Sequence, residues 1–163
     1  VYKRQSGSWF FGDAWGIVPD IITMAKGIAG GIPMGAVLIR EHISKTIHHG
    51  EHGSTFGGGP VACAALRANI DVIRKEGLVE NTAKVGAYIR EEAGKLPGVR
   101  GVKGRGLLLG IELEREAKEV RDLLLEKGII TGTSAHKNVL RLLPPLVLGQ
   151  QDVDVFIKAL RSL

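Results

Sequence analysis

Lys26 is the residue best placed for covalent chemistry. It directly follows an apolar, β-branched run at residues 17–25 and precedes a glycine-rich stretch at 27–33. A lysine amine is nucleophilic only when deprotonated, desolvation favours that neutral form, and such amines form Schiff bases with aldehydes. The glycines would let a bulky ring approach the backbone. We therefore expect an amine sequestered from water; the alternative is a lysine that simply points into solvent after a strand.

Ser54 and Thr55 lie in a second glycine-rich loop, residues 49–60. Adjacent hydroxyls on such a backbone can donate to phosphate oxygens, and a helix expected to begin near Val61 adds the positive end of its dipole. The alternative is a solvated Ser/Thr turn. No Gly-Lys-Ser/Thr motif occurs, so a nucleoside triphosphate site is not predicted.

Arg141 interrupts an apolar run at residues 139–143. If that run is a buried strand, its guanidinium lies in an apolar wall and needs a carboxylate partner, ideally a bidentate one. The partner is either internal to the protein or belongs to a substrate, and the sequence leaves both alternatives open.

Several other classes of site and partner are not expected. His48, His49 and His52 lack the spacing of a zinc helix and have no cysteine or carboxylate set beside them, so we expect no metal site. The single cysteine, Cys63, excludes an internal disulfide. The net charge of +5 comes without a basic tract, and no apolar run reaches the ~18 residues of a membrane span. Neither a nucleic acid nor a membrane is expected as a partner.

Hydrophobic periodicity predicts a chain of the α/β or α+β class, with 44% hydrophobic and 24% charged residues among 163. Strands are expected at residues 17–25, 35–39, 99–102, 107–113, 129–131 and 139–143. Helices are expected at residues 41–48, 61–76, 79–96, 117–127 and 152–163, with a domain boundary near 76–79.

The first residues have a different character from the rest of the chain. The sequence begins with Val1 rather than Met, and residues 1–5 carry no helix or strand period. We expect residues 1–5 to be a non-native leader, in which case Lys3 and Arg4 do not count and the net charge falls from +5 to +3.

Three motifs together resemble one family, the class III pyridoxal-phosphate aminotransferases, and most closely its acetylornithine aminotransferase branch. The segments PDIITMAKG (residues 19–27) and GGIPMGA (30–36) resemble the family's cofactor-lysine motif. The segment HGSTFGG (52–58) with Pro60 resembles its phosphate-contacting loop, and VLRLLPPL (139–146) resembles its carboxylate-binding segment. The motifs occur in the family's order and extend over nearly all of residues 6–163.

The resemblance implies a role for each candidate residue. Lys26 would bind pyridoxal 5'-phosphate covalently and then serve as base and acid in a 1,3-proton shift. Thr55 would bind the cofactor phosphate across the interface of a homodimer, and Ser54 would contact the acylated substrate. Arg141 would hold the α-carboxylate of glutamate or 2-oxoglutarate. The activity implied is transfer of the δ-amino group of N-acetylornithine to 2-oxoglutarate, in arginine biosynthesis; rivals are ornithine, 4-aminobutyrate or LysW-linked lysine as donor, or a non-catalytic truncated module.

The fold implied is a partial PLP-dependent transferase of fold type I, and a cytoplasmic enzyme. Residues 6–76 would form the end of the large cofactor domain, and residues 77–163 the C-terminal small α+β domain. Gly59 stands where the family usually has Asn, so we expect a looser loop there. The family's pyridine-nitrogen Asp, its ring-stacking aromatic residue and half of its phosphate cup would lie upstream of residue 1, so we expect the 163-residue chain to be inactive by itself.

Overall fold

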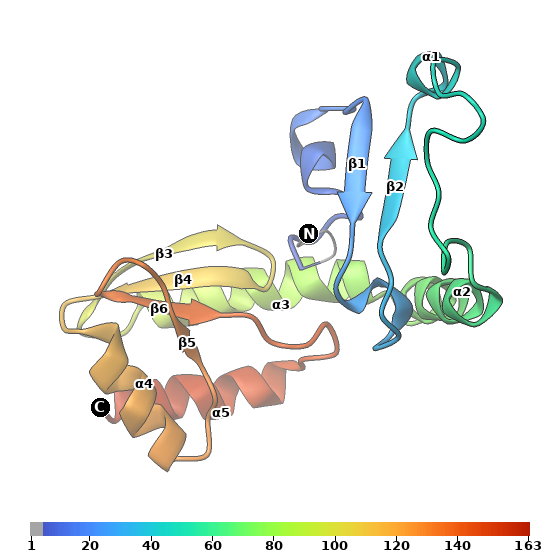
Figure 1. Cartoon of the computed structure of the whole chain (residues 1–163). Helices are drawn as coiled ribbons and strands as arrows, with labels where there is room; N and C mark the ends of the chain where they lie inside the picture. Colours follow the sequence, from blue (N-terminus) through green and yellow to red (C-terminus); the bar gives the residue numbers. More distant parts are fainter. Residues whose placement is uncertain (1–4) are drawn as a thin grey trace. The chain divides into compact units, whose positions relative to one another are not determined.

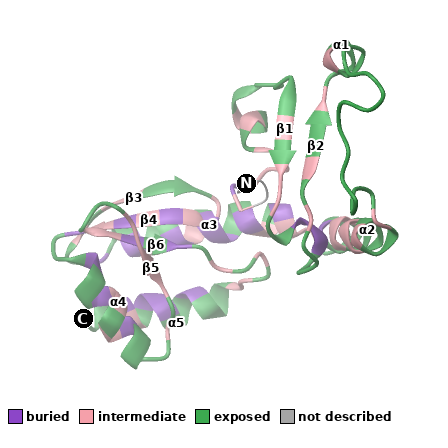
Figure 2. Cartoon of the chain, in the orientation of Figure 1, coloured by how far each residue is buried: buried purple, intermediate pink, exposed green. Residues whose placement is uncertain are grey.

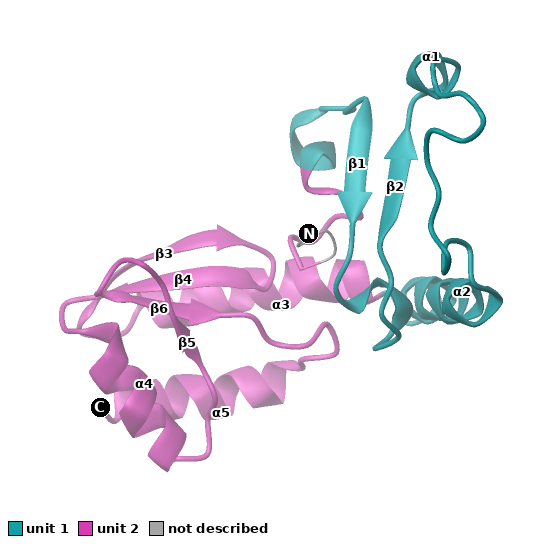
Figure 3. Cartoon of the chain, in the orientation of Figure 1, with its two compact units in different colours: residues 1, 12–77 teal, residues 2–11, 78–163 magenta. Residues whose placement is uncertain are grey.

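The computed structural model describes residues 5–163, which form two compact units (Figure 3). The first unit comprises residues 12–77, and the second comprises the described residues 5–11 together with 78–163. Residues 6–11 therefore belong with the second unit, whereas the sequence assigned them to the first. Apart from Gln5, the expected leader lies outside the described residues.

The first unit is built around a two-stranded antiparallel sheet and one long helix. Its elements are β1 (Ile21–Met24), η2 (Gly27–Ala29), β2 (Ala36–Ile39), α1 (Glu41–Ser44) and α2 (Pro60–Lys75). β1 pairs with β2 in a register from Ile21↔Ile39 to Met24↔Ala36. The strand expected from residue 17 begins only at Ile21, because Pro19 has no N–H to give to a ladder. The 3-10 helix η1 (Phe11–Trp15) begins with the last N-terminal residue of the second unit, and its other residues belong to the first unit.

The first unit buries little apolar surface. Its buried hydrophobic residues are Ile28, Ala29 and Ile73. Both strands of its sheet keep side chains in solvent: Ile21 is 53% exposed and Val37 60%. A two-stranded sheet also has two open edges, so this unit relies on η2 packing against α2 for its cohesion.

The second unit is an antiparallel four-stranded sheet with helices α3, α4 and α5 packed on it (Figure 1). Its elements are α3 (Leu78–Gly94), β3 (Val99–Arg105), β4 (Leu108–Leu113), α4 (Ala117–Glu126), β5 (Gly132–Thr133), β6 (Val139–Leu142) and α5 (Gln150–Arg161). The strand order is β3-β4-β6-β5. The Tyr88 hydroxyl of α3 donates to the Asp154 carboxylate of α5 at 2.6 Å, which raises the pKa of Tyr88. No helix formed by the described residues is long and apolar enough to cross a bilayer.

Nearly all of the core belongs to the second unit, as the buried residues of Figure 2 show. β4 alternates strictly, so that Leu109, Ile111 and Leu113 are buried while the residues between them are only half-buried. β6 continues this pattern: Leu140 and Leu142 point inward and Arg141 points outward. One face of the sheet therefore packs against the helices, and the other face carries the half-buried and exposed residues, Arg141 among them.

One expected strand is misplaced. The sequence predicts a strand at residues 129–131, but β5 is only Gly132–Thr133. Ile129 lies in the turn that follows α4, where its N–H donates to Leu124 O at 2.9 Å, and Ile130 is 87% exposed. The apolar run marks the turn out of the helix rather than the strand itself.

The uneven core predicts uneven stability. In the 163-residue chain, we expect backbone amides of β4 and β6 to exchange at least about 100-fold more slowly than those of β1 and β2, because the latter open without exposing a large core. Hydrogen exchange followed by mass spectrometry measures this, and uniform protection through both units would contradict it.

Candidate active site

Lys26 lies two residues after the end of β1 and occupies the N-cap position of η2, where its side chain forms no capping hydrogen bond. Its backbone has φ 64° and ψ −130°, and it is the only non-glycine residue with positive φ in the part of the chain that the structure describes. A side chain in this region costs on the order of 1–3 kcal/mol and persists only where the surroundings enforce it. Such strain concentrates at functional sites, so the geometry singles out the same lysine as the sequence does.

The Lys26 side chain is exposed, and its ammonium forms no ion pair with any described residue. The expectation that this chain sequesters the amine is therefore wrong for the chain as it stands. The neighbouring buried residues, Ile28 and Ala29, belong to η2, which packs on α2. The local sequence around a lysine carries no information about what covers it.

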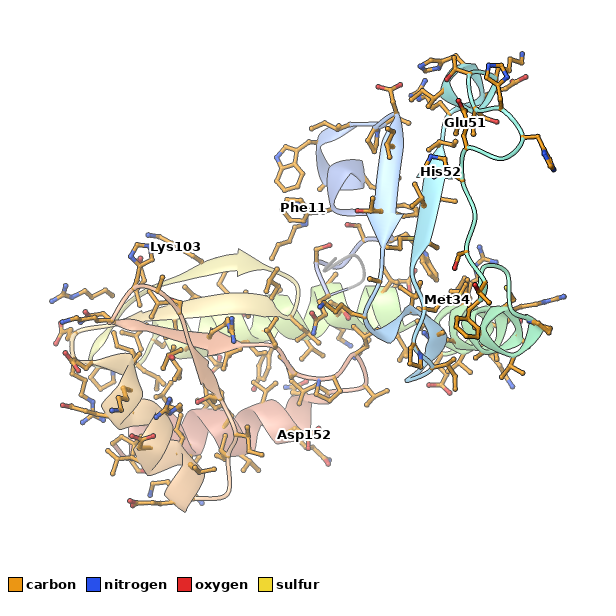
Figure 4. The ribbon with its side chains drawn as sticks, viewed as in Figure 1. Phe11, Met34, Glu51, His52, Lys103 and Asp152 are labelled. Carbon is orange, nitrogen blue, oxygen red and sulfur yellow. The ribbon has the colours of Figure 1, made fainter. Side chains whose placement is uncertain are left out.

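Ser54 and Thr55 lie on the exposed connection from α1 to α2, the segment in which Figure 4 labels Glu51 and His52. The Gly57 N–H donates to Ser54 O at 3.0 Å, and the Gly59 N–H donates to Phe56 O at 3.3 Å, so two successive turns lead into the helix. α2 then begins at Pro60, a residue that starts a helix without wasting an N–H donor. The two hydroxyls thus precede the positive end of a 16-residue helix.

Gly59 occupies the N-cap position of α2 and forms no side-chain cap. Asn is among the strongest N-cap residues, whereas glycine leaves the first N–H groups without a side-chain partner. The departure noted in the sequence therefore has a definite local meaning: it removes a helix cap at the end of the loop that carries Ser54 and Thr55.

Arg141 lies in the middle of the sheet of the second unit, on the face away from the helices. Its partners in register on the two neighbouring strands are both glycines, Gly110 of β4 and Gly132 of β5. A Cβ on Gly132 would lie 3.4 Å from the Nε and Nη2 atoms of Arg141, so the guanidinium lies directly over this glycine. Arg141 is exposed and forms no ion pair with the described residues, which answers the question left open by the sequence: within this part of the chain it has no internal carboxylate.

A depression of about 560 Å³ lies beside Arg141 in the second unit. Leu143, Pro144 and Pro145 line it, and so does Ile130 from the turn before β5. A guanidinium at the rim of an apolar depression suits a ligand that has a carboxylate and an aliphatic chain.

The described residues fit pyridoxal phosphate by their chemistry. Lys26 offers an amine without an ion-pair partner, and Ser54 and Thr55 of the same unit offer hydroxyls before a helix N-terminus. Arg141 belongs to the second unit and offers a guanidinium with no internal partner. These four side chains can thus bind an aldehyde, a phosphate and a carboxylate, respectively through an amine, two hydroxyls and a guanidinium.

Sequence reasoning overlooked Asn69. It belongs to α2 and occupies the apolar stripe formed by Ala62, Leu66 and Ile73, where its side-chain Nδ2 donates to Gly27 O at 3.0 Å and to Ile28 O at 2.9 Å. The available signal was an amide at helical spacing within an apolar face. A polar side chain at such a position needs hydrogen-bond partners, and here they are the backbone of the turn after Lys26.

The family model for "Aminotransferase class-III" matches residues 4–163. The chain belongs to this family. A relative named acetylornithine aminotransferase 1 from Bordetella bronchiseptica is 42% identical over 160 residues, which are 96% of this chain and 40% of the relative. The acetylornithine aminotransferase of Aquifex aeolicus is 42% identical over 159 residues, which are 98% of this chain and 41% of the relative.

Solved structures give the same result for the fold. A transaminase from the marine bacterium Virgibacillus superposes with a TM-score of 0.88 at 29% identity, over 99% of this chain and 42% of that one. Acetylornithine aminotransferase from Elizabethkingia anophelis gives a TM-score of 0.87 at 33% identity, over 99% of this chain and 44% of that one. The expected fold class, a partial α/β fold of the PLP-dependent aminotransferase type, is confirmed. The class-III chain spans about 40% of the length of the relatives it matches.

The positive φ of Lys26 predicts that a glycine at this position is more stable than an alanine, the reverse of the usual order of stability. Glycine in ordinary backbone is less stable than alanine by roughly 0.5–1 kcal/mol, but at positive φ it escapes the steric cost that alanine keeps. We therefore expect Lys26→Gly to be more stable than Lys26→Ala by about 1 kcal/mol. The measurement is the free energy of opening of the first unit, from amide exchange of β1 and β2.

Lys45 provides the matched control in the same unit. It is an exposed lysine with φ −67°, so Lys45→Ala should be at least as stable as Lys45→Gly. The same order at both positions would mean that Lys26 carries no backbone strain.

Proposed function

We propose that this chain contributes the cofactor lysine and the substrate-carboxylate arginine of a pyridoxal-phosphate-dependent aminotransferase. The observation that carries the proposal is the backbone of Lys26, strained at the position of the family's cofactor-lysine motif. We further propose the reaction of acetylornithine aminotransferases, which moves the δ-amino group of N-acetylornithine to 2-oxoglutarate in arginine biosynthesis. The support is the 42% identity to relatives of that name.

Lys26 is proposed to act twice. Bound pyridoxal phosphate supplies an aldehyde and an electron sink for the carbanion that forms next to the amino group. Lys26 Nζ would be the nucleophile toward that aldehyde, with loss of water, and when an amino donor frees it, it would move the proton of the 1,3-shift as base and then as acid. Because the residue stands at the junction of β1 and η2, its Cα is fixed while the long side chain stays free to move.

Ser54 and Thr55 are proposed to bind the polar ends of cofactor and substrate. Thr55 donates to the cofactor phosphate of the partner subunit in a homodimer, and Ser54 contacts the acylated amino-acid substrate. Their place on an exposed connection before α2 supports a contact made across an interface, since neither hydroxyl is buried within its own unit.

Arg141 is proposed to hold the α-carboxylate of glutamate or 2-oxoglutarate. Its planar fork can form two parallel hydrogen bonds with a carboxylate, and its side chain is exposed on the sheet between Gly110 and Gly132. Ornithine is the strongest rival donor, because the ornithine δ-aminotransferase of Plasmodium falciparum superposes with a TM-score of 0.83 at 31% identity.

A chimera tests the proposal. This chain replaces the matching 159-residue segment of the Aquifex aeolicus relative, with which it is 42% identical. We expect the chimera to transaminate N-acetylornithine with 2-oxoglutarate, and a second chimera, built on the Plasmodium falciparum ornithine δ-aminotransferase, to turn over ornithine poorly. Circular dichroism and gel filtration establish that each chimera is folded. A folded first chimera without turnover would contradict the proposal, and the reverse preference would favour the ornithine reaction.

Arg141→Lys in the first chimera locates the carboxylate contact. A point charge cannot replace the planar fork. We expect kcat/KM for glutamate to fall about 10- to 100-fold, the equivalent of one charged hydrogen bond, while cofactor absorbance stays unchanged. Arg161→Lys, an exposed change at the end of α5, is the matched control. Equal loss of cofactor and glutamate binding would make Arg141 a structural residue.

A further inference from the structure

Asn69 connects the helix α2 to the turn that follows Lys26. An amide side chain carries two N–H donors, and Asn69 uses both on consecutive carbonyls of η2. Nδ2 lies 3.0 Å from Gly27 O and 2.9 Å from Ile28 O. The side chain therefore clamps the turn 41 and 42 residues away in sequence.

The turn depends on this clamp because its own hydrogen bonds are weak. η2 is three residues long, and 3-10 geometry is poorer than that of an α-helix. The Gly30 N–H reaches Gly27 O only at 3.4 Å, and the Ile32 N–H reaches Ala29 O at 3.2 Å. Both bonds from Asn69 are shorter than either of these.

The clamp acts on the residue immediately before it. The Gly27 carbonyl lies one peptide beyond the Lys26–Gly27 peptide. The two bonds from Asn69 therefore fix where the chain runs after Lys26, which restricts the torsion angles of Lys26 and Gly27 together. On its other side, Lys26 follows β1, which is held by pairing with β2. Strain of this kind persists only where the surroundings enforce it, and Asn69 is a polar side chain that holds the chain on the second side.

We propose that Asn69 is a positioning residue, which locks η2 against α2 and thereby holds Lys26 in its left-handed backbone so that the amine starts from one defined place. The role in placing the reacting amine rests on the proposed function. The mechanical part, that Asn69 enforces the backbone of Lys26, stands on the contacts alone. Asn69 is proposed to contact the backbone of η2 and not the cofactor or the substrate.

The test uses the 163-residue chain without cofactor. We expect Asn69→Ala to raise hydrogen exchange at the Gly30 and Ile32 amides at least about 10-fold, since local opening now costs two hydrogen bonds less, while β1 and the middle of α2 change less than about 2-fold. Asn69→Asp keeps the shape and loses the donors, so it should act in the same way. If both variants instead raise exchange uniformly through residues 12–77, or leave Gly30 and Ile32 unchanged, the proposal is wrong.

Asn81→Ala is the matched control. Asn81 forks in the same way, with Nδ2 at 2.8 Å from Leu146 O and 3.1 Å from Leu148 O in the second unit. Its loss should leave exchange at Gly30 and Ile32 unaffected. A change there after Asn81→Ala would show that the effect of Asn69 is not local.

A second readout concerns the strain itself. With Asn69→Ala in the background, residue 26 is free to leave positive φ, so Lys26→Gly should lose its advantage over Lys26→Ala and the usual order should return. A purely packing role for Asn69 would leave that order inverted. Neither readout involves pyridoxal phosphate, so an inactive chimera would count against the proposed function only, and an unchanged turn would count against Asn69 only.

Discussion

The backbone of Lys26 is the constraint on which the proposed site depends. A lysine at φ 64° is unfavourable by itself, and it exists here because an antiparallel pairing ends on one side and a turn bound to a helix begins on the other. On one side of Lys26, pairing with β2 holds β1 in place. On the other side, the hydrogen bonds from Asn69 and the burial of Ile28 and Ala29 hold η2. The energy needed for this conformation comes from contacts outside the lysine, which leaves the side chain free for chemistry.

The second unit exposes a charged side chain, Arg141, on a sheet with a well-packed core. Arg141 needs no strain, because strand alternation alone turns it to the face opposite Leu140 and Leu142. What is specific is that its partners in register on both adjacent strands, Gly110 and Gly132, are glycines. The first unit therefore has a small core and a strained backbone at Lys26. The second unit has a large core and an exposed arginine, Arg141, between two glycines.

Much of this arrangement follows from sequence patterns, and the exceptions have physical causes. Apolar periodicity located α2, α3, α4 and α5 to within a few residues, and the Arg141 motif fell on a strand as expected. β5 was misplaced because an apolar turn after a helix looks like a short strand when only composition is read.

The properties that depend on distant segments were beyond the sequence. Exposure of Lys26 depends on what packs over a strand end, and no local pattern encodes that. The positive φ of Lys26 is not visible in the sequence. The two hydrogen bonds of Asn69 join residues that are more than 40 positions apart. The motif makes Lys26 the candidate, and the structure adds the contacts of the turn that follows it.

The most direct measurement of the central claim is covalent trapping on the folded chimera. Pyridoxal phosphate is added at a one-to-one ratio, borohydride fixes any adduct, and peptide mapping by mass spectrometry locates it. We predict a single trapped adduct on the peptide that contains Lys26, and none on that peptide after Lys26→Ala. An adduct spread over exposed lysines such as Lys45, or concentrated on another lysine while Lys26 stays unmodified, would contradict it.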